Sequence, residues 1–196
     1  DADTKRQLYS DIYDDSIWLI NLVENLLSVT RLEEGRMNLH ISAELVDDVI
    51  TEALRHVNRR SSEHQISVRH EKELLLARMD ARLIMQVILN IVDNAIKYTP
   101  KDSRILIETA QEGDQAVIRV SDDGPGIPDE IKAHVFDMFY TGANKVADSR
   151  RGMGLGLALC RSIIAAHGGQ IWVEDNSPHG TRFTFTLPAE EAYLHE

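Results

Sequence analysis

The segment 122–126 reads Asp-Asp-Gly-Pro-Gly, so a carboxylate stands beside two glycines that lie within three positions of each other. Glycine allows the backbone to turn tightly and to approach a flat ligand closely. The carboxylate of Asp122 could then accept a hydrogen bond from the exocyclic amine of such a ligand. A turn rich in Asp and Gly is more often only a turn, so this segment does not predict a site by itself.

A second glycine cluster spans 152–157 and reads Gly-Met-Gly-Leu-Gly-Leu. We expect a helix to begin near Leu155, so its free backbone N–H groups and positive end would face an anion such as a phosphate. The spacing fits neither a phosphate loop with Gly-Lys-Ser/Thr nor a GxGxxG that directly follows a strand. The cluster therefore disfavours the P-loop and dinucleotide-binding folds. Taken alone, phosphate binding and a plain loop are equal alternatives.

Polar side chains also share one edge of the strongest predicted helix, at three-four spacing: Asn90, Asp93, Asn94 and Lys97. Two amides, a carboxylate and an ammonium suit a divalent cation with attached phosphates, because Mg²⁺ prefers oxygen ligands and keeps several waters. The alternative is a solvated helix face. Asn is an indifferent helix former, however, so two on one face would be an odd choice for plain solvent.

These groups must be positioned by the surrounding elements, and the first of these is a long helix that ends at Glu33–Gly35. Its apolar stripe follows a three-four spacing: Leu8, Ile12, Leu19, Leu22, Leu26 and Val29. Because little other apolar material lies nearby, we expect this helix to pair with another helix. Packing on its own domain is the alternative. The predicted domains are 1–35 and 36–196.

From residue 37 onward the pattern changes to short mixed elements, which predicts an α/β or α+β layer fold. Helices are predicted at 46–58, from a cap at Asp80 to just before Pro100, and at 155–166. Strands are predicted at 38–42, 66–70, 74–79, 105–108, 116–120, 170–174 and 181–187, with a turn at 112–114 and an end at Pro188.

The composition excludes several classes of function. The 196 residues carry a net charge of −11, which would repel a phosphate backbone, so nucleic acid is not an expected partner. Cys160 is the single cysteine, which excludes an internal disulfide and fits a reducing compartment such as the cytosol. No run approaches the roughly 18 apolar residues that span a bilayer, so this part of the protein is not expected to enter a membrane.

Taken together, four segments resemble the sequence boxes of sensor histidine kinases, in the family's order. They are Asn-Ile-Val-Asp-Asn-Ala-Ile-Lys-Tyr (90–98), Asp-x-Gly-x-Gly (122–126), Phe-Asp-Met-Phe-Tyr (136–140) and Gly-x-Gly-x-Gly-Leu (152–157). With Gly180–Thr181 the resemblance covers about 37–188. The preceding helix resembles the second helix of the dimerisation and histidine phosphotransfer hairpin. The stretches 148–152, 157–163 and 166–169 are most similar to the Kdp-type potassium sensor kinase.

The resemblance implies a Bergerat (GHKL) α+β sandwich, shared with gyrase B, Hsp90 and MutL, in which helices cover one face of a mixed sheet. ATP would lie between the helices and a mobile lid of about 127–153, in which Arg150 or Arg151 could steady the γ-phosphate. Asp122 would bind the adenine amine, and Asn94, with Asn90 close by, would coordinate Mg²⁺. The catalytic residues would be Asn90, Asn94 and Lys97. The full implied binding set is Asn90, Asn94, Lys97, Tyr98, Asp122, Gly124, Gly126, Ile127, Phe139, Arg151, Gly152, Gly154, Leu155, Gly156, Leu157 and Thr181.

The implied activity is phosphoryl transfer from ATP to a histidine, followed by relay to a response regulator. The family's acceptor lies in a motif similar to Ser-His-Glu-Leu-Arg-Thr-Pro-Leu, and no such string occurs here, so this chain should not autophosphorylate. The resemblance also implies a homodimer through the first helix and a cytoplasmic domain of a membrane-attached protein. Two alternatives are an ATP-hydrolysing clamp of the same fold and a nucleotide-sensing module without transfer. Clamps carry a water-activating Glu where this chain has Asn90.

Overall fold

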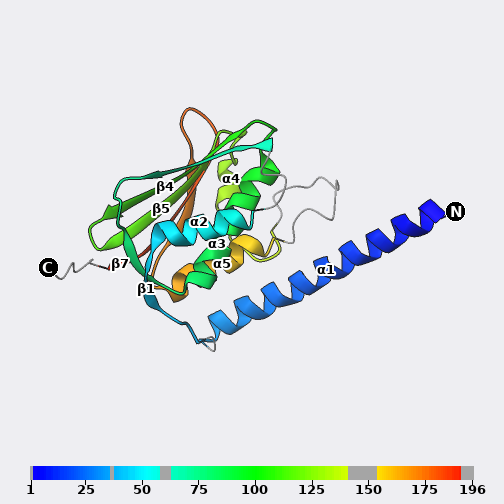
Figure 1. The fold of residues 1–196 in the computed structure, drawn as a ribbon, viewed down its shortest axis with the longest axis horizontal. Coiled ribbons are helices and arrows are strands. Elements are labelled where there is room, and N and C mark those ends of the chain that lie inside the picture. Colours follow the sequence, from blue (N-terminus) through cyan, green and yellow to red (C-terminus); the bar gives the residue numbers. More distant parts are fainter. Residues whose placement is uncertain (1, 36–37, 58–62, 141–153, 191–196) are drawn as a thin grey trace.

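The computed structural model describes residues 2–35, 38–57, 63–140 and 154–190 (Figure 1). Its elements follow the chain in the order α1 (Ala2–Glu33), β1 (Ser42–Leu45), α2 (Val46–Arg55), β2 (Gln65–His70), β3 (Leu76–Met79), α3 (Ala81–Tyr98), β4 (Arg104–Glu112), β5 (Gln115–Asp122), α4 (Asp129–Lys132), α5 (Gly156–Ala166), β6 (Ile171–Asp175) and β7 (Thr181–Glu190). None of these helices is long and apolar enough to span a bilayer.

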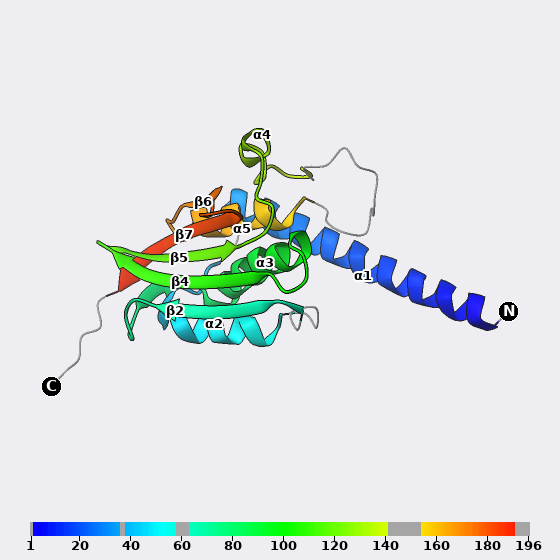
Figure 2. The same ribbon diagram turned by 90° about the horizontal axis from the view of Figure 1, so that it is seen from above.

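The strands form one seven-stranded sheet in the order β1-β3-β7-β5-β4-β2, and β6 also pairs with β7. The pairing of β2 with β4 is parallel, whereas the other pairings are antiparallel, so the sheet is mixed as predicted. The strand β7 therefore contacts three neighbours. Figure 2 shows the stacked strands, with α2, α3 and α5 gathered on one side of them.

The apolar stripe of α3 accounts for most of the packing between helices and sheet. Its buried members are Ile84, Val87, Ile88, Ile91, Val92 and Ala95. A fully buried side chain of this size contributes about 1.5 to 3 kcal/mol through loss of water contact, so the stripe sets which face of α3 meets the sheet. The predicted cap is confirmed, because the Leu83 N–H donates to Asp80 Oδ1 at 3.4 Å. The polar edge that carries Asn90 and Asn94 is thereby turned away from the sheet.

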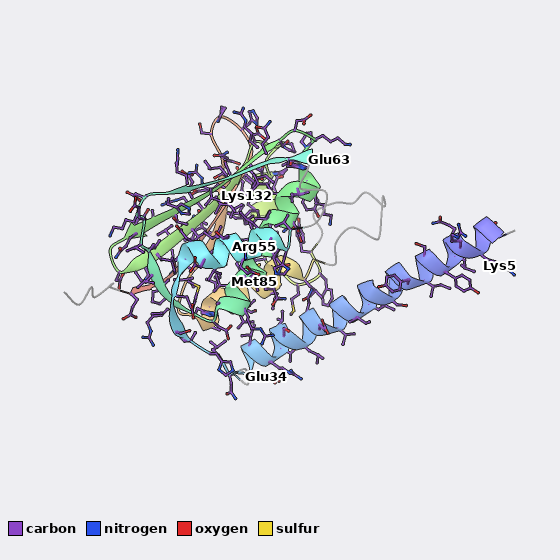
Figure 3. The ribbon with its side chains drawn as sticks, viewed as in Figure 1. Lys5, Glu34, Arg55, Glu63, Met85 and Lys132 are labelled. Carbon is purple, nitrogen blue, oxygen red and sulfur yellow. The ribbon has the colours of Figure 1, made fainter. Side chains whose placement is uncertain are left out.

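The long helix α1 packs on its own domain only at its end. Val29 and Leu32 belong to the core beside α5, where their exposed fractions are 1% and 9%. The part toward the N-terminus projects away, from Glu34 beside the domain to Lys5 at the far end (Figure 3). The side chains of Ile12 and Leu19 are there more than half exposed. The stripe is therefore only partly covered within the described chain.

Several predicted element boundaries are wrong: for example, α2 ends at Arg55 rather than at 58, and β4 continues to Glu112 rather than ending at 108. The strand expected at 38–42 lies instead at Ser42–Leu45, where it pairs with β3. The His40 N–H points elsewhere and donates to Asp80 Oδ2 at 3.0 Å. Pro188 does not end the last strand, which continues to Glu190. The Thr186 N–H donates to the Gln170 carbonyl, just before β6. Every second backbone nitrogen of a strand faces the same side, so the nitrogen of Pro188 also faces that side, but it lies beyond the first residue of β6. Proline at this position therefore removes no hydrogen bond between β7 and β6.

His167 is the C-cap residue of α5. The ring is buried, with Nδ1 2.7 Å from the Ile163 carbonyl, while Nε2 accepts a hydrogen bond from the Asp80 N–H at 3.0 Å. A ring that donates from Nδ1 and accepts at Nε2 is neutral. His167 therefore joins the end of α5 to the start of α3, and its charge plays no part in this contact.

Candidate functional site

The polar edge of α3 meets the beginning of α5. The side-chain amide of Asn90 donates to the backbone carbonyl of Gly156 at 3.4 Å. A β carbon on Gly156 would lie 3.7 Å from the amide carbon of Asn90, so the two helices approach closely here. Cys160 lies one turn further along α5, where burial raises the pKa of its thiol to about 12 and keeps it protonated. The thiol is therefore inert packing beside this contact.

Asp122 ends β5 with its side chain almost fully buried. Its Oδ1 accepts two backbone hydrogen bonds, from the N–H of Gly124 at 2.9 Å and from the N–H of Thr181 at 3.2 Å. Within the described residues, no protein group donates to Oδ2. Burial raises the pKa of this carboxyl, and the two backbone hydrogen bonds partly oppose that rise. The arrangement leaves one carboxylate oxygen available to a ligand in a partly dry site.

The loop after Asp122 is held between α3 and the start of β7. A β carbon on Gly124 would lie 2.6 Å from the Thr99 methyl group, so only glycine fits beside the end of α3 without a shift. Gly126 has φ +79°, and its β carbon would contact the Gly180 carbonyl at 3.4 Å. The loop therefore follows a path that requires glycine, and it brings α3, β5 and β7 to one place.

Lys97 and Tyr98 form the outer end of this region. The Lys97 ammonium lies 4.9 Å from the centre of the Tyr98 ring, and the Tyr98 side chain is 60% exposed. Asn94 lies one turn before them, and within the described residues its amide makes no hydrogen bond to the protein. A cation, an exposed ring and an available amide therefore follow one another along the edge of α3.

The segment after α4 is fastened to the second glycine cluster. The Phe139 N–H donates to the Gly154 carbonyl at 2.9 Å, and both residues have positive φ, +64° and +63°. Phe136 packs edge-on against Phe183 with the ring centres 6.2 Å apart. The predicted lid is thus anchored at its first part by Phe136, while the Phe139 side chain itself is 58% exposed.

These contacts agree with comparisons to known proteins. Residues 79–191 match the family described as histidine kinase-, DNA gyrase B-, and HSP90-like ATPase. The chain belongs to this ATPase family. It is 41% identical over 190 residues to the sensor protein KdpD of Clostridium acetobutylicum, covering 97% of this chain and 21% of that protein. The resemblance to Kdp-type sensor kinases is therefore confirmed, although the chain spans about a fifth of that relative's length.

Solved structures give the same family assignment for the fold. The catalytic domain of the histidine kinase ThkA matches with a TM-score of 0.68 at 31% identity, over 76% of this chain and 95% of that chain. ThkA in complex with the response regulator protein TrrA matches with a TM-score of 0.67 at 28% identity, over 88% of this chain and 49% of that chain. The predicted GHKL α+β fold is thereby confirmed.

Most of the residues implied to bind nucleotide lie in this part of the ATPase fold, but they cannot all act through their side chains. Leu155 is fully buried, so only its backbone could face a ligand, whereas Leu157 and Ile127 pack against the core with their side chains partly exposed. Thr181 is buried and acts on Asp122 through its N–H. Arg150, Arg151 and Gly152, with the rest of the expected lid from 141 to 153, lie outside the described residues, and their roles stay predictions.

Sequence reasoning missed the turn between β6 and β7. The Asn176 amide donates to the Asp122 backbone carbonyl at 2.8 Å, and His179 Nδ1 lies 3.3 Å from the Gly124 carbonyl. The segment 176–180 reads Asn-Ser-Pro-His-Gly, which predicts a turn and gives no sign of its partners. A separate hollow of about 450 Å³ lies between α5 and β6, and none of the predicted site residues lines it. Its lining is Arg161, Ala165, Gly169, Gln170, Ile171 and Trp172.

Proposed function

We propose that this chain is the ATP-binding catalytic region of a sensor histidine kinase, which transfers the γ-phosphoryl group of Mg-ATP to a histidine outside this sequence. The observation that carries the proposal is the carboxyl of Asp122, whose Oδ1 is fully used by two backbone N–H groups while Oδ2 accepts nothing from the described protein. An acceptor held in this way in a partly dry site suits the exocyclic amine of adenine.

The phosphate end of the nucleotide is assigned to the start of α5. The helix presents its first N–H groups and its positive end there, beside Asn90 on α3. Lys97 stands further along the same edge of α3, where its ammonium would attract the phosphates. Gly154 and Gly156 would let the backbone approach the phosphate chain, together with Gly152 and Arg151 if they act as the resemblance implies.

The donor set of α3 fits a magnesium ion that arrives with the nucleotide. Among the described residues, no group of three or more His, Cys, Asp or Glu could hold a metal, so a dedicated protein cage is not what this part of the fold offers. Mg²⁺ commonly takes one or two protein oxygens and completes its shell with phosphates and water. Asn94 would supply one oxygen and Asn90 a second. Bound there, the ion would neutralise phosphate charge.

The chain's own contribution to transfer is position and charge. The loop at 122–126 fixes the base, while Lys97 and the helix-end amides stabilise the negative charge that spreads over the transferring group. The acceptor histidine, a homodimer formed through α1, relay to a response regulator and attachment of the whole protein to a membrane belong to the same proposal. The ThkA–TrrA complex supports relay to a response regulator, and the other parts follow from the family resemblance of the sequence.

The test is to mix this chain with labelled ATP, Mg²⁺ and a separately made acceptor helix pair, and to look for acid-labile phosphohistidine. We expect label on the acceptor pair and none on this chain alone. Substantial steady-state ATP hydrolysis without an acceptor would favour the clamp of the same fold. Tight ATP binding with no transfer to the acceptor would favour the nucleotide-sensing module.

A further inference from the structure

The turn 176–180 between β6 and β7, together with Thr181 that follows it, contacts the loop 122–126 at two backbone carbonyls and one carboxylate oxygen. Asn176 donates to the Asp122 carbonyl at 2.8 Å, His179 Nδ1 approaches the Gly124 carbonyl at 3.3 Å, and the Thr181 N–H reaches Asp122 Oδ1. The turn is closed on itself by a hydrogen bond from the Asn176 N–H to the Gly180 carbonyl at 3.0 Å. We call this turn the brace, because it holds the backbone of Asp122, the residue proposed to bind adenine.

Asn176 is the part of this brace that is held on both sides. Its Oδ1 accepts from the Arg182 guanidinium at 3.3 Å, and Arg182 in turn donates through Nε to Ser121 Oγ at 2.9 Å. Glu108 and Glu174 lie 3.9 Å from the same guanidinium and keep it in place. Because each end of the Asn176 amide has a fixed partner, the side chain has one orientation, with its NH₂ group toward Asp122.

We propose that Asn176 is a positioning residue for purine recognition: by holding the backbone carbonyl of Asp122, it directs the Asp122 Oδ2 atom at the exocyclic amine of an adenine nucleotide. This inference rests on the proposed function. Asn176 does not touch the ligand itself. Without the Asn176 side chain the end of β5 can move. The Asp122 carboxylate then keeps its charge, but its Oδ2 atom is no longer aligned with the N–H bond of the adenine amine. Hydrogen bonds weaken steeply with such misalignment.

Inosine triphosphate provides the probe, because it carries a carbonyl where ATP carries the exocyclic amine. The preference for adenine is the ratio of the ITP to the ATP dissociation constant, measured by calorimetry in the presence of Mg²⁺. We expect Asn176→Ala to reduce this ratio about 5- to 10-fold, mainly through weaker ATP binding. Asn176→Asp keeps the shape and the Arg182 partner but cannot donate, so it should reduce the ratio as well. Asn38→Ala, which removes the same side chain from an exposed position, should leave it unchanged.

A double-mutant cycle separates positioning from general damage. If Asn176 acts through Asp122, then Asn176→Ala should change the ratio little in the Asp122→Asn background. Equal weakening of ATP and ITP by Asn176→Ala and Asn176→Asp, or no change in either, would overturn the inference while leaving the proposed function intact. If Asp122→Asn itself leaves the ratio unchanged, the adenine contact of the proposed function fails and this inference fails with it. Should Asn176→Ala not fold, the Asn176→Asp variant decides alone.

Discussion

Gly180 and Asp122 lie in direct backbone contact: a β carbon on residue 180 would stand 1.9 Å from the carbonyl oxygen of residue 122. Gly180 also has φ +111°, a conformation that other residues rarely adopt. The start of β7 can therefore reach the end of β5 only because residue 180 has no side chain. The proposed adenine end of the site depends on this contact, since Thr181 follows directly and donates to the Asp122 carboxylate.

Gly180→Ala should accordingly damage both the fold and adenine binding. We expect a loss of more than about 3 kcal/mol in the free energy of unfolding, because backbone strain of roughly 1 to 3 kcal/mol adds to the overlap with the Asp122 carbonyl. Gly113→Ala is the matched control: φ is +62° there, but nothing lies within 4 Å of the new β carbon, so only the strain should appear. Denaturant unfolding of both variants tests this, and equal losses would contradict the contact.

Asp122→Asn should weaken ATP binding by roughly 1 to 3 kcal/mol, the range for losing a buried polar partner. The Asn oxygen can still accept from Gly124 and Thr181, so the fold should persist. Calorimetric titration with ATP measures the effect. An affinity equal to that of the unsubstituted protein would remove Asp122 from the site.

Acidic pH should reveal the same carboxyl, because burial raises the pKa of Asp122 above its usual 3.8. In the unfolded chain the group returns to its ordinary pKa, so the folded state binds the proton more tightly. Its contribution to the free energy of unfolding is therefore favourable at low pH and is lost as pH rises through the folded pKa. We expect the stability of Asp122→Asn relative to the unsubstituted protein to be greatest at neutral pH and to shrink on acidification. Urea midpoints from pH 3.5 to 7 measure this, and a gap independent of pH would contradict it.

The magnesium assignment predicts that Asn94→Ala removes the tightening of ATP binding by Mg²⁺. ATP affinity is measured with Mg²⁺ and with a chelator, for this variant and for Asn38→Ala as control. The control should retain the full difference, because its position is exposed and none of the residues assigned to the site is changed. Magnesium dependence that survives in Asn94→Ala would mean that Asn94 is not a ligand.

The two parts of the α1 stripe should respond differently to substitution. Leu19 and Leu26 are 52% and 39% exposed, so Leu19→Glu with Leu26→Glu should prevent self-association in sedimentation with little change in melting temperature. Val29 is 1% exposed, and Val29→Ala should instead cost about 1 to 3 kcal/mol of stability. A protein that stays monomeric at high concentration without substitutions would count against dimerisation through α1.

The sequence predicts a structural feature correctly where the residues that cause it are close together in the chain, and fails where they are far apart. The apolar spacing of α3 and the Asp80 cap are local, and both were predicted correctly. The stretch 38–42 alternates like a strand, but the observed strand begins four residues later, at Ser42, while the His40 N–H bonds to Asp80, which no neighbouring residue signals. Asn176 contacts a residue 54 positions away, so its turn-like surroundings conceal its partner. Interactions of this kind appear only once the sheet order is known.

The position of β7 between β3 and β5 has a consequence for how the protein is made. In the described structure β3 and β5 do not pair with each other, and β7 lies between them and joins them into one sheet. During synthesis from the N-terminus, the strands made before β7 can therefore form only two separate groups, β1 with β3 and β2 with β4 and β5. The proposed nucleotide site includes Thr181 at the start of β7, so it is complete only once β7 has joined the sheet, and bound ATP would then stabilise the finished fold.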